Sequence, residues 1–528
     1  MEAAAAGGRT LPLFVLDPHF AAAGRVGARR FAFLLESLAD LDASLRDRYG
    51  SRLVVVRGEP CEVLAQLMRG ECASVPGVRA ASVLWEEECV EPWGVQRDAS
   101  VEAAVAAAGG AAKAVAGGGH LLWEPRAALA ANKGVAPTTM PAMLKLAAKL
   151  GAPPPPLEAP AALPMLPEAL RLASSDDAAW AWGVPKLDSL EGFRDSAIEP
   201  GSNAFGVVGG ERAGLERLRL SMEREGGEWV RKFEKPKSKS TCFEGTEAST
   251  TVLSPYLKFG CVSARTVKSQ LDAAYARGAH AQPPGSLLGQ LYFREMSYLH
   301  ALKRGAEFAQ QPSPVCADIP WDDPSTDAQA AERLSAWERG ATGYPLIDAS
   351  MRQLKETGWL HHLARHSVAC FLTRGDLWLP WTAGAAVFDR ELLDADWAVN
   401  NFNWLGLSGC APWSPPYFRV YTPVPDHNKS SLNVQDAQGA FVDKFVPELA
   451  KLPAKYKYAP WTAPLAVLNA AGVKLGETYP RPIVDHKTKS KENIAAFKAA
   501  LAANKEKQKA TKPTPPQPPA PKRKRDAP

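Results

Sequence analysis

The sequence predicts a parallel α/β domain followed by a larger helical domain. Within the first 90 residues, short apolar runs typical of strands alternate with apolar residues at helical spacing. From about residue 205 to residue 410, the apolar spacing is mainly helical. A chain of 528 residues is too long for one core, so at least two domains are expected.

Each element of the α/β pattern has its own local signal. Residues 11–17 form an apolar run that ends in a turn signal, and residues 53–58 form a β-branched run closed by glycine. Phe31–Leu45, which has helical periodicity, lies between them, and a third strand is predicted over Ala81–Glu86. This alternation predicts a parallel sheet with crossover helices.

The composition allows several classes of function. A total of 62 Lys and Arg against 57 Asp and Glu gives a net charge of +5, which permits a nucleic-acid partner without arguing for one. Eight cysteines are scattered singly without a CxxC motif, which indicates a reducing compartment and no disulfide framework. The longest apolar candidate, Val101–Trp123, carries Glu102 and Lys113, so no transmembrane helix is predicted.

Two stretches have the composition of linkers or tails. Residues 151–168 are rich in Pro and Ala and are typical of a connector. Residues 504–528 are rich in Lys and Pro, cannot bury a core, and are expected to be disordered. The basic cluster Lys522–Arg525 resembles a nuclear localisation signal, and a solvated basic tail is an equal alternative.

The segment Gly358–Leu372 holds three of the nine histidines and is predicted to be a buried helix. His362 and His366 are four residues apart, so they share one helical face and can hold a metal or handle protons near neutral pH. A zinc site at this spacing usually has a Glu between the two histidines as a base, but here Arg365 stands between them. A fixed positive charge beside an incoming metal cation disfavours a metal site. Two hydrogen-bonded core histidines remain the alternative.

Two further segments contain candidate binding residues. Ser254 before Pro255 is predicted to cap a helix, and hydroxyls ahead of a helix N-terminus can hold a phosphate. Asp394 and Asp396 lie among apolar residues and need partners if buried, and Arg365 is a candidate partner.

Together these motifs resemble the photolyase/cryptochrome flavoproteins. The resemblance runs from about Leu13 to Ala500, and the histidine segment is specific to the branch of (6-4) photolyases and animal-type cryptochromes. The cyclobutane-dimer branch typically has Asn and Met where His362 and His366 stand. The motifs that carry the resemblance are Gly358–Asp376, Thr250–Ser263, Gly343–Pro345 with Asp348, and Leu393–Asn400.

The resemblance implies a Rossmann-like antenna domain joined to a helical domain that binds FAD. The implied parts are the antenna domain over 1–135, a connector over 136–204, the FAD domain over 205–503 and the tail over 504–528. A second antenna chromophore of deazaflavin or folate type is left open. The implied cofactor-binding residues are Lys235, Thr250, Thr251, Val252, Leu253, Ser254, Gln290, Arg294, His362, Arg365, Asp394, Asp396 and Asn400.

The implied roles within this set differ. Residues 250–254 match the phosphate-binding stretch, Asp394 is expected to pair with Arg365, and Asn400 matches the residue that faces flavin N5. Four indoles match the electron-transfer chain of the family from the flavin outward, although buried Trp is more often simple core. They are Trp404, Trp381, Trp321 and, as the fourth member of the animal-type branch, Trp378.

The function implied is light-driven, FAD-dependent repair of (6-4) photoproducts in UV-damaged DNA by a nuclear, monomeric lyase. His362 and His366 are the expected catalytic residues, one as the acid and the other tuning it. The alternative is a cryptochrome, a blue-light receptor that signals through protein partners without repair. Neither a membrane nor a metal is expected.

The sequence departs from the family in three places. The family's first strand and an Arg-Asp-Leu-Arg-like loop have no counterpart, so a central strand is expected to be missing and the chain to be an incomplete gene model. Phe293 and Gly406 stand where substrate-side tryptophans are usual. Residues 410–441, which are expected to border the pocket, follow the family poorly.

Overall fold

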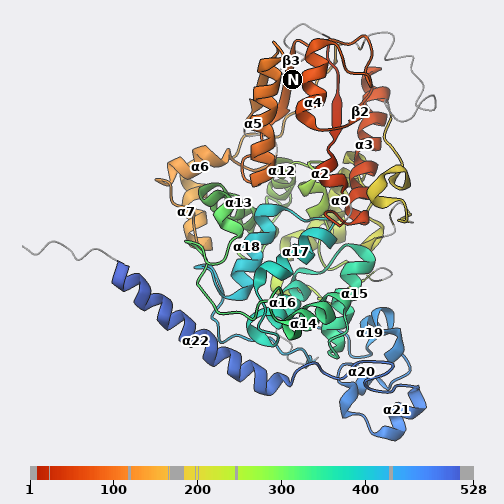
Figure 1. The fold of residues 1–528 in the computed structure, drawn as a ribbon, viewed down its shortest axis with the longest axis vertical. Coiled ribbons are helices and arrows are strands. Elements are labelled where there is room, and N and C mark those ends of the chain that lie inside the picture. The colour runs from red at the N-terminus through yellow and green to blue at the C-terminus, as the bar shows by residue number, and fades with distance from the viewer. Residues whose placement is uncertain are drawn as a thin grey trace, which may run out of the picture.

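The computed structural model describes residues 9–511 except 23, 117–119, 165, 167–182, 197, 200, 202, 244, 245, 247 and 427–431. Figure 1 shows the α/β part at one end of the molecule, the helical part below it, and α22 (His486–Thr511) along one side. No helix in the described part is long and apolar enough to cross a membrane.

The α/β part follows the predicted order of elements. All three predicted strands form, and the helical pattern around Phe31–Leu45 becomes the long helix α3. A fourth strand, β4, follows α5 in a stretch with few β-branched residues, and its sequence gave no strand signal. The elements are β1 Leu13–Leu16, α2 Pro18–Ala21, α3 Ala28–Tyr49, β2 Val54–Arg57, α4 Pro60–Arg69, β3 Ser82–Glu86, α5 Pro92–Ala107 and β4 Ala111–Val115.

The strands pair in parallel, as predicted, but they form two separate pairs. Leu13 of β1 is in register with Val54 of β2, and Ser82 of β3 is in register with Ala111 of β4. Within the described residues, the two pairs do not join into one hydrogen-bonded sheet.

The first strand pair is covered on both faces, as parallel strands require. Val55 packs with residues of α3 such as Phe31 and Leu35, whereas Val54 and Val56 pack with α4 and α5. Because side chains of a strand alternate between faces, the continuous Val54–Val56 run serves two cores.

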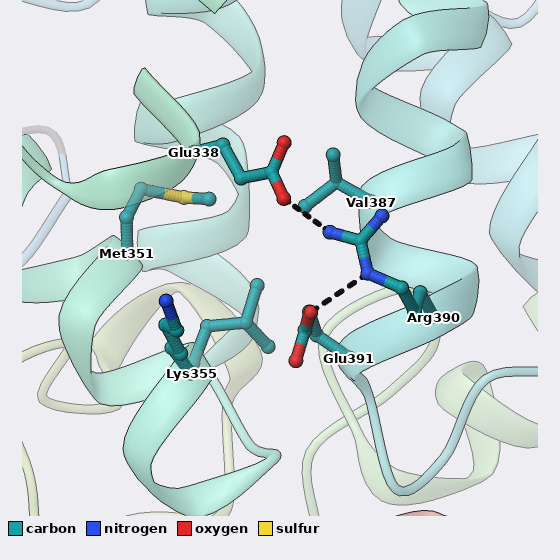
Figure 2. Close-up of a pocket in the computed structure, with 7 residues that line it drawn as sticks. Glu338, Met351, Lys355, Val387, Arg390 and Glu391 are labelled. Atoms are coloured by element: carbon teal, nitrogen blue, oxygen red, sulfur yellow. Dashed lines mark hydrogen bonds and ion pairs between the residues drawn. The ribbon is translucent and has the colours of Figure 1, made fainter. Parts of the chain in front are cut away.

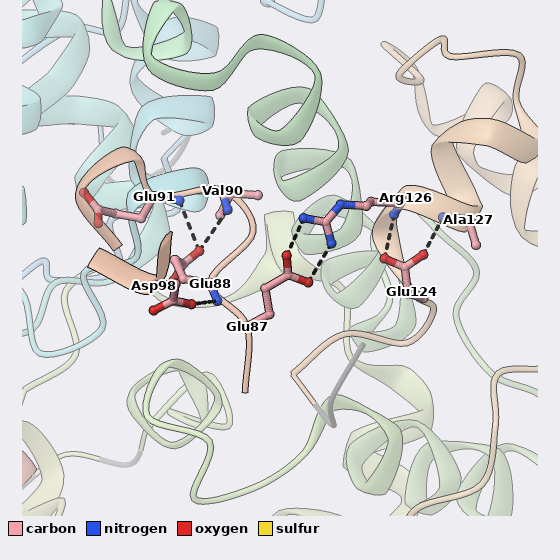
Figure 3. A network of polar contacts seen from close by, with 8 residues as sticks. All are labelled: Glu87, Glu88, Val90, Glu91, Asp98, Glu124, Arg126 and Ala127. Carbon is pink, nitrogen blue, oxygen red and sulfur yellow. Dashed lines mark hydrogen bonds and ion pairs between the residues drawn. The ribbon is translucent and has the colours of Figure 1, made fainter. Parts of the chain in front are cut away.

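A network of carboxylates fixes the chain that follows β3 (Figure 3). Glu87 accepts two hydrogen bonds from Arg126, at 2.6 and 2.7 Å, and thereby ties the end of β3 to α6 (Pro125–Ala131). Glu88 accepts from the backbone N–H groups of Val90 and Glu91 just ahead of α5. The loop is therefore held by charge-assisted hydrogen bonds together with the buried side chain of Val90.

The helical part has two buried clusters, and the larger one also includes residues of the α/β part. Phe33 of α3 contacts the rings of Tyr256 and Phe259, with centroids 5.4 and 5.2 Å away. The helices of the helical part are α9 Glu211–Glu223, α10 Glu228–Lys232, α11 Ser254–Lys258, α12 Ala264–Tyr275, α13 Leu287–Arg304, α14 Ala328–Arg339, α15 Pro345–Thr357, α16 His362–Cys370, α17 Trp381–Glu391, α18 Trp397–Ser408, α19 Ala440–Phe445, α20 Ala454–Lys457 and α21 Leu465–Ala471.

Two segments are more ordered than the sequence predicts. Helix α7 (Met140–Leu150), capped by Thr139, lies inside the predicted connector and buries Met143 and Leu146. Helix α22 continues to Thr511, so the prediction of a disordered tail from residue 504 is wrong for residues 504–511. Asn504 exchanges hydrogen bonds with the backbone of Asp318, a contact between distant residues that local composition does not reveal. The basic cluster Lys522–Arg525 lies outside the described residues.

Glu295 on α13 links the helical part to the segment that follows the α/β elements, and it allows a test of how folding stability depends on pH. Its carboxylate accepts the Leu122 N–H at 3.0 Å, and burial raises its pKa from 4.5 to about 7. The folded state therefore binds more protons than the unfolded state between these values, and stability falls as the pH rises through them. Ionised Glu295 is expected to cost about 3 kcal/mol above this window.

Glu295→Gln keeps an oxygen acceptor for Leu122 but cannot ionise. Urea unfolding from pH 5 to pH 8 is expected to show the variant gaining stability relative to wild type as the pH rises. A stability difference that does not change with pH would mean that Glu295 titrates normally in the folded protein.

Candidate functional site

The histidine segment begins with a tight turn and not with helix, which corrects the prediction for Gly358–His361. Gly358 ends α15 at φ 68°, and its carbonyl accepts the Leu393 N–H at 2.8 Å. A Cβ at Gly358 would lie 2.9 Å from Leu393 Cγ, so glycine is required here both for φ and for space. His361 then caps α16, with Nδ1 accepting the Leu363 N–H.

His362 and His366 lie on one face of α16, as predicted. Their ring centroids are 6.4 Å apart with planes at 78°. His362 Nε2 lies 3.1 Å from the Lys235 carbonyl and 3.5 Å from Ser238 Oγ. The ring of His366 lies 6.2 Å from that of Tyr421. The imidazole pair is therefore enclosed by the segments around residues 235 and 421.

All three imidazoles favour the neutral state in this setting. Burial, and next the charge of Lys235, lowers the pKa of His361 and of His366 to about 3 and holds the pKa of His362 well below 6.5. Burial and the charge of Arg365 lower the pKa of Lys235 to about 8. An anion bound beside these groups would offset the positive charge and raise the pKa of the histidines.

The predicted partner of Asp394 is present. Arg365 Nη2 donates to both carboxylate oxygens of Asp394, at 2.9 and 3.1 Å, and its Nε donates to the Leu360 carbonyl. Ser254 Oγ also donates to Asp394, at 2.6 Å. The side chain of Asp394 is only 6% exposed, so these contacts compensate a desolvated charge.

The second acidic residue, Asp396, caps α18 and lies in a separate cluster. It accepts the Val399 N–H at 3.0 Å and the Tyr298 hydroxyl at 2.6 Å. Burial would raise the pKa of Asp396, but the charges of Lys258 and Arg294 prevail and hold it below its usual value. Asp396 is therefore ionised at neutral pH.

Arg294 is held by His120, a residue that the sequence did not single out. Arg294 donates to the His120 carbonyl at 2.5 Å and to its Nε2 at 2.9 Å. Burial, and next the charge of Arg294, lowers the pKa of His120 to about 3. The neutral His120 also contacts the Tyr298 hydroxyl. A single His in a Gly-rich stretch gave no signal of this contact, because its partners lie more than 170 residues away along the chain.

The stretch Thr250–Ser254 leads into α11 with one correction. Leu253, and not Ser254, occupies the N-cap position, and Ser254 is the first helical residue. Val252 has a φ of 51°, which turns the chain so that Val252 and Leu253 are buried while Ser254 is exposed. The Ser254 hydroxyl is thus free of a capping role and reaches Asp394.

Gln290 and Asn400 make backbone contacts on neighbouring helices. Gln290 Nε2 donates to the carbonyls of Pro284 and Ser286, and Asn400 Nδ2 donates to Ala385 at 2.9 Å. Among the described residues neither amide oxygen accepts a hydrogen bond, so each can accept one from a ligand.

The family resemblance assigns four tryptophans to electron transfer, and they lie on or near helices α17 and α18 and in the loops beside them. Trp404 on α18 packs against Gly384 of α17, where any side chain would collide with its ring. Trp381 is the first residue of α17 and is fully buried. Trp321 and Trp378 are partly buried, and their rings are 4.7 Å apart. The structure therefore places two indoles in the core and two near the surface.

The divergent segment fills the space beside Gly406. A Cβ at Gly406 would lie 3.0 Å from Trp413 Cδ1, and the Trp413 ring stacks on Phe402 at 4.5 Å. Arg374, which is 1% exposed, donates to the carbonyls of Tyr417 and Arg419 at 2.9 and 2.7 Å. The segment is thus anchored by a buried guanidinium although its sequence is unusual.

A small pocket elsewhere does not suit a large ligand (Figure 2). It has a volume of about 130 Å³, well below the several hundred Å³ of ordinary ligand sites. Arg390 forms an ion pair with Glu338 across it and another with its chain neighbour Glu391. In the described residues, no group of three or more His, Cys, Asp or Glu could hold a metal.

The Arg365–Asp394 pair gives a test by double mutation. Asp394→Asn and Arg365→Gln are each expected to lower the free energy of unfolding by about 3 kcal/mol, because each leaves a desolvated charge without its partner. The double variant is expected to lose less than the sum. Chemical denaturation of all four proteins measures the coupling, and additive losses would mean that the pair contributes no interaction energy.

Comparisons with known proteins cover nearly the whole chain. Residues 1–161 match the DNA photolyase family and residues 287–499 match the FAD binding domain of DNA photolyase. The chain is 37% identical to Cryptochrome-1 of Gallus gallus over 92% of the chain and 73% of that protein. It is 38% identical to the (6-4)DNA photolyase of Oryza sativa subsp. japonica over 96% of the chain and 88% of that protein.

Solved structures agree on the fold. A bacterial class III photolyase from Agrobacterium tumefaciens superposes with a TM-score of 0.69 at 27% identity, over 94% of this chain and 93% of that one. A cryptochrome from Synechocystis sp. PCC6803 gives a TM-score of 0.74 at 23% identity, over 94% and 95% of the two chains, and this likeness concerns the fold alone.

Proposed function

Since this chain belongs to the photolyase/cryptochrome family, we propose that it is a light-driven (6-4) DNA photolyase. Its substrate is the pyrimidine-pyrimidone (6-4) photoproduct in UV-damaged DNA, and its cofactor is FAD. The observation that carries the proposal is the pair His362 and His366 on one face of α16, enclosed by Lys235 and Tyr421.

The polar residues that the family resemblance implies offer the groups that a flavin dinucleotide needs. Lys235 and Arg365 offer positive charge and hydrogen-bond donors to a pyrophosphate, with the Ser254 hydroxyl beside them. Asp394 and Asp396 offer acceptors to hydroxyl and ring N–H groups, and Gln290, Arg294 and Asn400 supply further polar contacts. Thr250, Thr251, Val252 and Leu253 lead the chain into this site. When bound, FAD supplies the photoexcited electron.

The two histidines then handle the proton that the lesion needs to migrate its hydroxyl group. With Lys235 charged and no anion present, both imidazoles are neutral. The negative charge of bound cofactor and DNA offsets Lys235, raises the pKa of the pair, and lets one imidazole hold a proton. The two rings titrate as a coupled pair, so the acid belongs to the pair.

The second candidate is a cryptochrome, a photoreceptor that signals through protein partners. Phe293 and Gly406 favour it, because each removes an indole expected on the substrate side. The indole of Trp413 lies beside Gly406, so this space holds an indole from another position of the chain. Repair with pre-reduced protein separates the two functions, since a pure receptor photoreduces but does not repair.

The proposed setting is the nucleus, with the protein acting as a monomer on DNA. A basic C-terminal tail is consistent with nuclear import. Fluorescence of a tagged full chain, compared with a variant in which Lys522–Arg525 are replaced by alanine, tests the location. Equal nuclear fluorescence of both proteins would show that this cluster does not direct import.

A further inference from the structure

A buried polar network, here called the Tyr298 network, joins the loop after β4 to the acidic residue that caps α18. Its members are His120 in the loop between β4 and α6, Arg294 and Tyr298 on α13, and Asp396. Tyr298 and Asp396 are 4% and 5% exposed, so the network is withdrawn from water. Tyr298 has no role in the function argued so far.

Two helices fix the carboxylate of Asp396. Its Oδ1 accepts the Val399 N–H at 3.0 Å, which is the N-cap bond of α18. Its Oδ2 accepts the Tyr298 hydroxyl from α13 at 2.6 Å. Because each oxygen is bonded to a different helix, the carboxylate cannot rotate without breaking a charge-assisted hydrogen bond. Each oxygen keeps a further lone pair that can accept a hydrogen bond from a ligand.

The guanidinium of Arg294 is fixed by two members of the network. Its Cζ lies 4.9 Å from the centre of the Tyr298 ring, which is one helical turn further along α13. Its Nη1 donates to the His120 carbonyl at 2.5 Å, and its Nη2 lies 2.9 Å from His120 Nε2. In the described part of the chain Arg294 Nε donates no hydrogen bond, so this donor is available to a ligand.

His120 closes the network. Its ring meets the Tyr298 ring edge-on, with centroids 5.1 Å apart and planes at 70°. Its Nε2 also contacts the Tyr298 hydroxyl. The hydroxyl therefore lies between the imidazole of the loop after β4 and the carboxylate of Asp396, and it contacts both.

We propose that Tyr298 and His120 are positioning residues that hold Asp396 and Arg294 in the orientation that binds FAD. The inference rests on the proposed function, because it takes Asp396 and Arg294 as contacts of the cofactor. Without these partners the carboxylate would turn about its side-chain bonds and the long Arg294 side chain would sample many rotamers. Binding would then have to order both side chains, which lowers affinity.

Tyr298→Phe removes one hydroxyl and keeps the ring beside Arg294. The affinity of the apoprotein for FAD is expected to fall about 10-fold or more, the usual contribution of a hydrogen bond to a charged group. The visible circular dichroism of the bound flavin is expected to change. Its reduction potential is expected to become more positive, since a displaced carboxylate places less negative charge beside the ring. Fluorescence titration, circular dichroism and redox titration measure these three quantities.

Two substitutions of His120 test the same network without altering Tyr298. The amide of His120→Gln can still donate and accept hydrogen bonds near the position of Nε2, so this variant is expected to keep most of the FAD affinity. His120→Leu is expected to lose about as much affinity as Tyr298→Phe. Tyr292→Phe is the matched control, since Tyr292 is also on α13 and 8% exposed but stacks on Trp123, outside the network. It is expected to behave as wild type.

Unchanged FAD affinity and an unchanged flavin spectrum in both Tyr298→Phe and His120→Leu would overturn the proposal and leave the proposed function intact. So would a loss of affinity that only parallels a loss of unfolding free energy, with circular dichroism and potential unchanged, because the residues would then act through the fold. If Tyr298→Phe does not fold, equal FAD affinity of His120→Gln and His120→Leu overturns the proposal. A wild-type protein that cannot bind FAD would overturn both the proposal and the proposed function.

Discussion

His366→Asn and His362→Asn are each expected to lower light-driven repair of a (6-4) oligonucleotide by about 10²–10⁴-fold, the usual contribution of general acid catalysis. Asn keeps a polar side chain of similar reach but cannot carry the proton. Both variants are expected to keep their FAD, because the substitutions leave Asp394 and its partners Ser254 and Arg365 unchanged. Repair is measured under blue light with the enzyme reduced beforehand.

The double variant and a control sharpen this test. Because the two imidazoles act as a unit, the double variant is expected to lose little more than either single one. His280→Asn is the control, since His280 stacks on Tyr275 far from α16 in sequence and contacts neither histidine. Normal repair by both site variants would mean that the histidines are structural.

Trp381→Phe is expected to slow photoreduction of oxidised FAD strongly and to leave repair by pre-reduced enzyme nearly intact. In the proposed function, photoreduction draws electrons inward through Trp381 and Trp404, whereas repair sends an electron from the flavin to DNA. Phe retains most of the apolar packing, although the smaller ring leaves a cavity in a fully buried position. Transient absorption follows the tryptophan radical, and a repair assay on chemically reduced enzyme follows the other branch.

Trp337→Phe is the matched control for this variant. Trp337 is also fully buried, and its Nε1 donates to the Val368 carbonyl at 3.1 Å, but it is not part of the proposed chain. It is expected to cost a similar amount of stability while photoreduction continues. Equal loss of photoreduction and repair in Trp381→Phe would mean that this residue acts through the fold or the cofactor site.

The elements that the sequence predicts well are those with a strong local pattern. The β-branched run Val54–Val56 forms β2 within one residue of the predicted bounds, because such a run suits a strand buried on both faces. The helix at the histidines begins later than periodicity predicts, because Gly358 adopts a left-handed conformation to meet Leu393. That contact is tertiary, and no local pattern records it.

In the site too, contacts with a local sequence signal could be predicted, whereas contacts made only by tertiary structure could not. The pairing of Arg365 with Asp394 follows from charge balance in an apolar setting, and the structure confirms it. The contact of Arg294 with His120 joins single residues from distant segments. A lone histidine in a Gly-rich stretch has no spacing to reveal it, so only the folded chain shows its contact.

The most direct test of the account is repair of a defined (6-4) photoproduct oligonucleotide by reduced, FAD-loaded protein, compared in blue light and in the dark. Restoration of intact pyrimidines in the light, and none in the dark, is the predicted result. A protein that binds FAD and photoreduces but leaves the lesion unchanged in the light would contradict the photolyase assignment and favour the cryptochrome.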